Sequence, residues 1–269
     1  MMARRREPVA WIALVLAAIG ALPARAAERG SLAFGLDRFD GTEVLQGWSA
    51  GAMWLSRTHD QDPFQIGLAA VRIEGGHWAY AAAGRTFRIG RRTRCDASAR
   101  LGRASFPGQA TDFEELGAIL VASIVPGRWT ASIGDRWLNV GDREGQLLQG
   151  GVDFTSPKRW GAGLSLFSGI SGDLEEDYVN GSVRLRTPSL TWLLGATIGR
   201  TVPYPGASSD QTQSSTEVYL SVTIPLGRQQ MSLIGSRFDG ETATRRTLSA
   251  LWLLPLSPAA AAPPEGVQP

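Results

Sequence analysis

The sequence predicts an all-β fold, a single antiparallel up-and-down transmembrane β-barrel of about 14 strands, with 12 strands as the alternative. The first observation is that polar and apolar residues alternate with a period of two over long segments, which is the periodicity of β-strands. The second is that short and long connections alternate along the chain, as they do at the two ends of such a barrel. The third is that no stretch of 18 apolar residues, the length needed for a transmembrane helix, follows residue 26.

The first 26 residues have the three parts of a secretory signal peptide. Arg4 to Arg6 form a basic segment, residues 9–22 are uncharged and mainly apolar, and Ala24-Arg25-Ala26 offers small residues to a signal peptidase. A membrane anchor is disfavoured, because a spanning helix needs about 20 apolar residues. We therefore expect a cleaved signal peptide at 1–26, a barrel at 27–255 and a Pro/Ala-rich periplasmic tail at 256–269.

Charge and cysteine content exclude two classes of function. The signal segment holds four basic residues and one acid, so its removal lowers the formal net charge from +2 to −1. A near-neutral mature chain gives no case for binding nucleic acid. Cys95 is the single cysteine, so neither a disulfide framework nor a thiolate metal site is expected.

Turn signals divide the mature chain into fourteen expected strands. In one of the clearest, Trp192, Leu194 and Ile198 share one face, and Gly195 and Thr197 share the other. The expected strands lie near 31–39, 46–56, 64–73, 77–89, 92–104, 113–125, 128–138, 143–155, 158–170, 177–187, 189–201, 213–225, 228–238 and 243–254. Several are longer than the mode of about 5–6 residues in soluble sheets and match a tilted membrane strand of about 9–11 residues.

The polar face of these strands is expected to line the lumen. In 92–104 the polar set is Arg92, Arg94, Asp96, Ser98 and Arg100, and the opposite set is Thr93, Cys95, Ala97, Ala99 and Leu101. The opposite set is too small to fill the core of a soluble lipocalin-like barrel, which is the alternative. We therefore expect the apolar face to meet lipid.

Tryptophans share this apolar face in pairs. Trp48 with Trp54, and Trp129 with Trp137, fit aromatic girdles at two membrane interfaces, with core packing as the alternative.

Asp135 has the same parity as Trp137, so it shares the apolar face. The sequence therefore predicts a bulge at Asp135 or a strand that has already left the membrane.

The connections give the orientation of the barrel. Short ones follow the strands that end near 89, 125, 155, 187 and 225, and longer polar ones follow those that end near 104, 170 and 201. This phase places both chain ends in the periplasm and requires an even number of strands. Segment 56–63 is long where a short turn is expected, and segment 74–76 is short where a loop is expected.

The signal peptide, the alternating strands and the last strand, 246–253 with its late Trp252, resemble those of Gram-negative outer-membrane β-barrels. The resemblance implies location in the outer membrane, contact with lipid and lipopolysaccharide, and insertion by the barrel-assembly machinery. The chain departs from the pattern because a tail follows the last strand. The segment Gly134-Asp135-Arg136-Trp137-Leu138 is similar to YaiO-like barrels found beside exopolysaccharide systems, which implies envelope or polysaccharide-export partners.

No residue pattern predicts catalysis. The enzymes that resemble this fold use histidine with serine, asparagine or aspartate, and this chain offers only His59 and His77, neither in a recognisable serine motif. We expect no catalytic residue, no metal site and no cofactor. The expected function is a pore or export conduit for small or anionic solutes or polysaccharide. The alternatives are a structural scaffold barrel with a plugged lumen and, more distantly, a lipid-modifying enzyme.

A ring of arginines is expected in the periplasmic half of the lumen. The expected ring consists of Arg85, Arg92, Arg94, Arg184 and Arg186, with Asp96 and Asp153 as counter-charges. Arginine stays ionised and presents a planar fork suited to carboxylate or phosphate, and a basic ring in a narrow pore selects anions. The alternative is a structural network that fills the barrel.

We predict that the mature protein fractionates with outer membranes, resists extraction by urea and changes its mobility on gels when heated. The reason is that long alternating strands with an apolar outer face require lipid around them. Recovery of the protein in the soluble periplasmic fraction would contradict the predicted fold.

Overall fold

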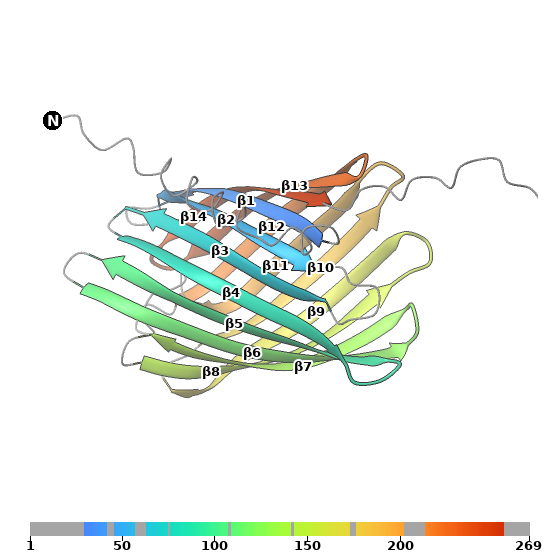
Figure 1. The fold of residues 1–269 in the computed structure, drawn as a ribbon, viewed down its shortest axis with the longest axis horizontal. Coiled ribbons are helices and arrows are strands. Elements are labelled where there is room, and N and C mark those ends of the chain that lie inside the picture. The colour runs from blue at the N-terminus through green and yellow to red at the C-terminus, as the bar shows by residue number, and fades with distance from the viewer. Residues whose placement is uncertain are drawn as a thin grey trace, which may run out of the picture.

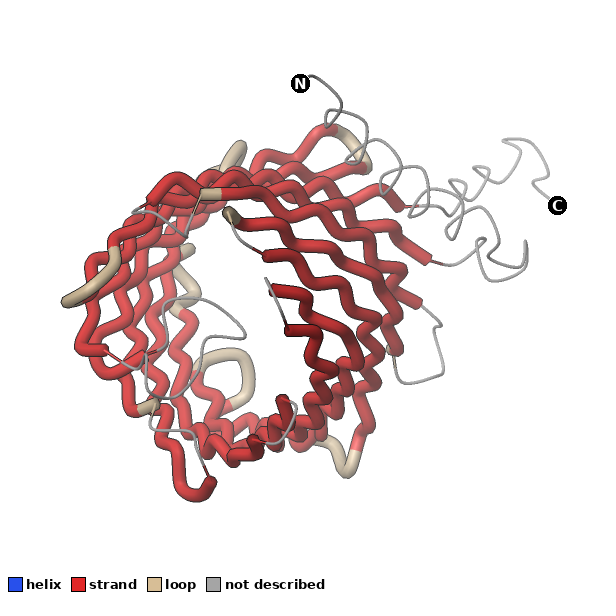
Figure 2. The backbone as a smooth tube through the Cα atoms, turned by 90° about the vertical axis from the view of Figure 1, so that its left-hand side faces the viewer, coloured by secondary structure: helices blue, strands red, loops and turns tan. Residues whose placement is uncertain are grey.

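The computed structural model describes residues 30–41, 46–56, 63–74, 76–106, 109–140, 143–172, 176–201 and 213–255. Over these ranges the chain forms a closed barrel of 14 antiparallel strands, as the sequence predicts (Figures 1 and 2). The strands are β1 (Gly30–Gly41), β2 (Gly47–Ser56), β3 (Phe64–Ile73), β4 (Gly76–Arg88), β5 (Thr93–Phe106), β6 (Gln109–Val125), β7 (Trp129–Val140), β8 (Arg143–Thr155), β9 (Trp160–Gly172), β10 (Asp177–Arg186), β11 (Thr191–Thr201), β12 (Gln213–Leu226), β13 (Gln229–Gly240) and β14 (Thr244–Pro255).

Each strand pairs with its neighbours in sequence, and β1 pairs with β14 to close the ring. The closing pair runs from Ser31↔Pro255 to Gly41↔Arg245 without a break in register. Closure gives every strand two hydrogen-bonded neighbours, so the barrel has no sheet edge. Among the described residues, no helix is long and apolar enough to span a membrane.

The two ends of the barrel differ in their connections. One end, here called the turn end, holds both termini of the barrel and the tight turns 89–92, 126–128, 156–159, 187–190 and 227–228. The opposite end, the loop end, holds the described connecting residues 46, 74, 176 and 241–243. Gly127 and Gly227 have φ values of 70° and 65°, which an L side chain rarely adopts, so glycine makes these turns tight.

Alternation along the strands separates an outward from an inward face. Most of the large exposed apolar side chains occupy the outward positions, among them Ile133 and Leu248, which are 62% and 64% exposed. Inward positions of the same strands hold residues such as Thr86, Ser98 and Asn180. An apolar surface that surrounds the whole barrel requires a lipid environment.

Aromatic side chains gather on the outward face at the turn end. The ring centroids of Trp129 and Phe154 lie 4.8 Å apart, and those of Phe154 and Trp160 lie 5.0 Å apart. The three rings come from the ends of β7, β8 and β9. Amphipathic aromatic rings in such a row suit the boundary between hydrocarbon and headgroups.

Element boundaries differ from the expected ones mainly in β6. This strand begins at Gln109 rather than near residue 113 and pairs with β5 as far as Phe106↔Gln109. Its first residues include the polar Thr111 and Asp112, which interrupt the apolar alternation, so the sequence pattern does not reveal where the strand begins. The predicted signal peptide and the predicted tail lie outside the described residues and stay predictions.

Asp135 does not sit at a bulge. The β7 register runs through Asp135 without a shift on both sides, and the two register shifts of the barrel lie at Ser123/Val125 and at Gln146/Leu147. Asp135 therefore points outward, and its Oδ2 accepts a hydrogen bond of 2.6 Å from Gln146 Nε2. The carboxylate is thus bound on the outward face by Gln146, which lies at the register shift between β8 and β9.

We predict that the double variant Asp135→Leu, Gln146→Leu stabilises the barrel in lipid by about 1–2 kcal/mol. Removal of a carboxylate from the lipid face outweighs the loss of one hydrogen bond, which contributes about 1 kcal/mol net. Urea titration of unfolding from lipid vesicles measures the change. Ile133→Asp, which adds a carboxylate on the same face, should destabilise the barrel. Loss of stability in the double variant would show that something other than lipid covers this pair.

Candidate functional site

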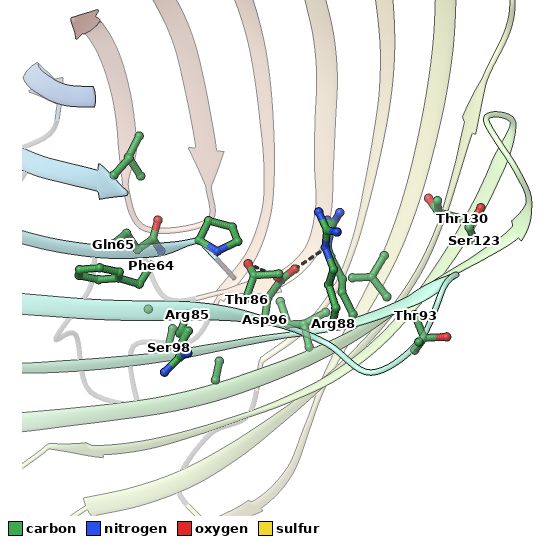
Figure 3. A pocket seen from close by; sticks show the side chains of 18 of the residues that line it. Phe64, Gln65, Arg85, Thr86, Arg88, Thr93, Asp96, Ser98, Ser123 and Thr130 are labelled. Carbon is green, nitrogen blue, oxygen red and sulfur yellow. Dashed lines mark hydrogen bonds and ion pairs between the residues drawn. The ribbon is translucent and has the colours of Figure 1, made fainter. Parts of the chain in front are cut away.

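A cavity of about 1100 Å³ occupies the turn-end half of the lumen (Figure 3). Its walls come mainly from the inward faces of β4 to β7, and residues of the turn between β4 and β5 line its mouth. The inward strand positions carry four arginines, and the turn adds two more. These are Arg88, Arg94, Arg100 and Arg136 on the strands and Arg91 and Arg92 in the turn. Asp96 and Glu115 are the acids in its lining.

Asp96 is held at the mouth by two donors. Thr86 Oγ1 donates to Asp96 Oδ1 at 2.7 Å (Figure 3). Arg94 Nε donates to Asp96 Oδ2 at 3.1 Å. The register explains the arrangement, because Thr86 faces Asp96 and Arg88 faces Arg94 across β4 and β5. The single carboxylate thus stands beside two arginines that neighbouring strands bring together.

Glu115 forms the second charged group, farther from the mouth. Its carboxylate lies 3.2 Å from Arg100 Nη1 and 3.4 Å from Arg136 Nε. The Glu115 side chain is 13% exposed, whereas those of Arg100 and Arg136 are 48% and 40% exposed. One largely covered acid therefore orients two arginines whose guanidinium groups remain accessible from the cavity.

Apolar side chains lie next to the Arg100–Glu115–Arg136 group on the side of the loop end. Arg100 lies 5.9 Å from the Tyr80 ring centroid, and Tyr80 packs edge-to-face on Phe113 at 6.0 Å. Gly102 makes room for this packing, because a Cβ there would lie 2.5 Å from the Phe113 ring. Tyr80 and Phe113 in turn pack on a buried inward cluster, which consists of Ile73, Trp78 and Ala104. Along β4 to β6 the inward face therefore changes from charged to apolar toward the loop end.

The opposite wall at the loop end also carries inward aromatic side chains. Arg245 lies 5.9 Å from the ring centroid of Phe39 and 5.5 Å from that of Phe238. Its Nη2 lies 3.8 Å from Glu217 Oε1. Cation–π contacts on both sides fix this arginine, so it acts as a packing element of the wall.

The structure brings part of the expected ring together. Arg92, Arg94 and Asp96 all line the cavity, although Arg92 belongs to the turn rather than to β5. Arg184 and Arg186 lie on the inward face of β10, and Asp153 lies on the inward face of β8 beside Gly163. These three residues are not part of the cavity lining, because β8 and β10 form another part of the wall.

Arg85 borders the cavity, but its assignment to the inward face is wrong. The inward positions of β4 are the even-numbered ones, and Arg85 pairs with Phe64 and Ala97 on the outward face. Its guanidinium lies 5.0 Å from the Phe87 ring centroid, and Figure 3 shows its side chain on the opposite side of β4 from those of Thr86 and Arg88. The register of β4 with β3 and β5 therefore places Arg85 on the outward face.

Sequence reasoning missed Arg88, Arg91, Arg100, Arg136 and Glu115 as members of the site. Three of them carried a usable signal. Arg100 shares the polar face of Arg94 and Asp96 in the sequence. Arg88 has the parity of Gly84 and Thr86, and the outward parity of Asp135 implies that Arg136 points inward. Glu115 has no such signal, because its role depends on its two partners on neighbouring strands.

Histidine and metal chemistry find no support among the described residues. His77 lies on the outward face of β4 and pairs in register with Arg72. No group of three or more metal-ligating side chains occurs within the described ranges. His59 lies outside them.

Solved structures share this fold at low sequence identity. The CymD monoaromatic hydrocarbon channel matches with a TM-score of 0.62 and 8% identity, over 86% of this chain and 89% of that one. The Pseudomonas putida toluene transporter TodX matches at 0.56 and 10%, over 88% and 92% of the two chains. Acinetobacter baumannii Omp33 matches at 0.55 and 11%, over 84% and 97%.

The chain therefore has the fold of outer-membrane β-barrels. No protein-family model matches the sequence, and no curated protein does. The similarity to YaiO-like barrels stays a prediction.

We predict that Glu115→Gln lowers the free energy of unfolding in lipid vesicles by about 1–2 kcal/mol. The substitution removes the charge that holds Arg100 and Arg136 close together, and hydrogen bonds to charged groups contribute about this much. Asp112→Asn is the control, because Asp112 and Arg103 form an exposed pair at 3.7 Å that should contribute less than about 0.5 kcal/mol. Equal effects of the two variants would contradict the role of Glu115.

Proposed function

We propose that this protein is a non-enzymatic outer-membrane pore that passes small anionic solutes. The observation that carries the proposal is the charge of the cavity. Of the arginines in its lining, six lie at inward strand positions or in the turn, and its two acids, Asp96 and Glu115, are each bound by arginine. The cavity therefore keeps an excess of positive charge.

An arginine-lined lumen favours anions for two physical reasons. Low-dielectric walls concentrate the field of the fixed charges and raise the local concentration of counter-ions. The guanidinium fork also offers bidentate hydrogen bonds to carboxylate and phosphate. The inward Arg184 and Arg186 on β10 add positive charge on another part of the wall.

The same lining argues against an apolar substrate. Entry of a hydrocarbon would displace water from charged groups without replacing the hydrogen bonds, which is costly. The substrates that name the CymD and TodX channels are thus poorly matched to this cavity. A carboxylated or phosphorylated solute, including an acidic saccharide, fits it better.

A structural scaffold with a plugged lumen is the second candidate. The observation that favours it is the inward apolar cluster of Ile73, Trp78 and Ala104 with Tyr80 and Phe113. Small barrels often fill their interiors with side chains. A barrel that folds but never conducts would support this candidate.

The proposed setting is the outer membrane, reached through a cleaved signal peptide and the barrel-assembly machinery. Lipid would cover the outward apolar face, and lipopolysaccharide would surround the loop end. Envelope or polysaccharide-export proteins are the proposed protein partners. A lipid-modifying activity gains no support from His77, which faces outward beside Arg72.

We predict that the purified barrel conducts in planar bilayers with a preference for chloride over potassium. Arg94→Glu with Arg184→Glu should reverse the sign of the reversal potential in a salt gradient, because both side chains point inward. Arg94→Gln with Arg184→Gln should weaken the preference without repelling Asp96.

Arg103→Glu provides the matched control, since Arg103 lies on β5 but on the outward face. It should leave the ion preference unchanged. Cation preference in the unmodified barrel, or an equal response to Arg103→Glu, would refute the proposed pore.

A further inference from the structure

The connections at the two ends of the barrel carry opposite charges. At the turn end, all charged residues in the described connections are basic. They are Arg91, Arg92, Arg128, Lys158, Arg159 and Arg228, and all are exposed. At the loop end, the charged residues in the described connections are Glu74, Glu176 and Glu241. The barrel therefore has a charge asymmetry along its axis.

The rest of the sequence agrees with this asymmetry at the loop end. The connecting segments there that lie outside the described residues contain Glu43, Asp142, Asp173, Glu175 and Asp210 and no basic residue. At the turn end, segment 57–62 is mixed, with Arg57, Asp60 and Asp62. An anion that approaches from the loop end meets acidic connections, whereas one that approaches from the turn end meets mainly basic ones.

The cavity opens on the basic side and holds two separate groups of arginines. The outer group combines Arg88 and Arg94, which pair in register, with Arg91 and Arg92 of the same hairpin. The inner group is Arg100 with Arg136, both oriented by Glu115. Arg100 lies six positions from Arg94 on β5, and the register places Arg136 level with Ser98. The two groups therefore lie about 13–20 Å apart along the strands at roughly 3.3 Å per residue.

A spacing of this size selects for ligand length. A small monovalent anion contacts one group at a time. An extended chain with several carboxylates or phosphates contacts both groups at once, and its second contact is favoured by the high effective concentration that the first contact creates. Asp96 lies between the groups and is already bound by Thr86 and Arg94, so part of its charge is offset.

We propose that the turn-end mouth is a binding site for an extended polyanion, captured from the turn side of the membrane. This inference deepens the proposed pore by naming its substrate class and its side of entry. The ligand carries carboxylates or phosphates at intervals along a flexible chain. Arg91 and Arg92 make the first contacts, and Arg100 and Arg136 make the later ones.

Equilibrium binding to the full barrel in lipid nanodiscs tests the site without any need for conductance. The probes are an oligoglutamate of about ten residues and a linear polyphosphate of about ten phosphates, both long enough to contact the two groups at once, with glutamate monomer and oligolysine of equal length as controls. We expect both polyanions to bind and glutamate monomer to bind at least tenfold more weakly. Arg91→Gln with Arg92→Gln should weaken oligoglutamate binding about tenfold. Binding of one probe alone identifies which anionic group is recognised.

Arg128→Gln with Lys158→Gln is the matched control. It removes the same charge from the same end of the barrel, but neither residue lines the cavity. It should change the affinity less than twofold. Equal losses in the two double variants would overturn the proposal, since they would show attraction by the whole basic rim, as expected for contact with anionic headgroups. Absence of polyanion binding would also overturn it.

Sided addition in planar bilayers tests the direction of capture. The orientation of the barrel is determined with a single cysteine, placed at Thr242 of the loop end or at Arg228 of the turn end in a Cys95→Ala background. Reaction of this cysteine with a membrane-impermeant thiol reagent shows which end faces the side of addition. Oligoglutamate should block current at concentrations at least tenfold lower from the turn side than from the loop side. Equal block from both sides would refute capture from the turn side. A barrel that binds oligoglutamate but never conducts would refute the pore and retain the binding site.

Discussion

The hydrogen bonding between β1 and β14 is the constraint on which the rest of the structure depends. In hydrocarbon, no water is present to satisfy a free backbone N–H or C=O, so an open sheet edge is excluded. Pairing of the first strand with the last, from Ser31↔Pro255 to Gly41↔Arg245, removes both edges at once. Once the ring is closed, each residue has only two places to point, into lipid or into the lumen. The chemistry of the lumen is therefore a consequence of parity.

The residues at inward positions also change in character along the axis of the lumen. On β4 and β5 the inward pairs run from Arg88↔Arg94 and Thr86↔Asp96 at the turn end to Tyr80↔Gly102 and Trp78↔Ala104 near the loop end. One hairpin therefore contributes both charged residues of the cavity lining and apolar residues nearer the loop end. Glu115 stands at the boundary, where it holds two arginines on neighbouring strands.

Local alternation was enough to predict the strands, because each hairpin carries its own pattern and its own turn. The start of β6 escaped prediction since Thr111 and Asp112 interrupt the apolar pattern there. The site was less predictable. Arg92, Arg94 and Asp96 follow from the parity of one strand, whereas the Arg100–Glu115–Arg136 group joins three strands and needs the register between them. Arg85 shows how a single-residue error in parity moves a charge from the lumen to the lipid face.

Pairing between sequence neighbours also makes the barrel modular. Each inward–outward pattern is complete within a hairpin, and the turns at Gly127 and Gly227 need only a few residues to form one. Gain or loss of a whole hairpin preserves the alternation of every remaining strand, while gain or loss of one strand would bring the two chain ends to opposite sides. Lumen width in such a chain can therefore evolve in steps of two strands, with the arginine-bearing hairpin β4–β5 retained intact while the opposite wall changes.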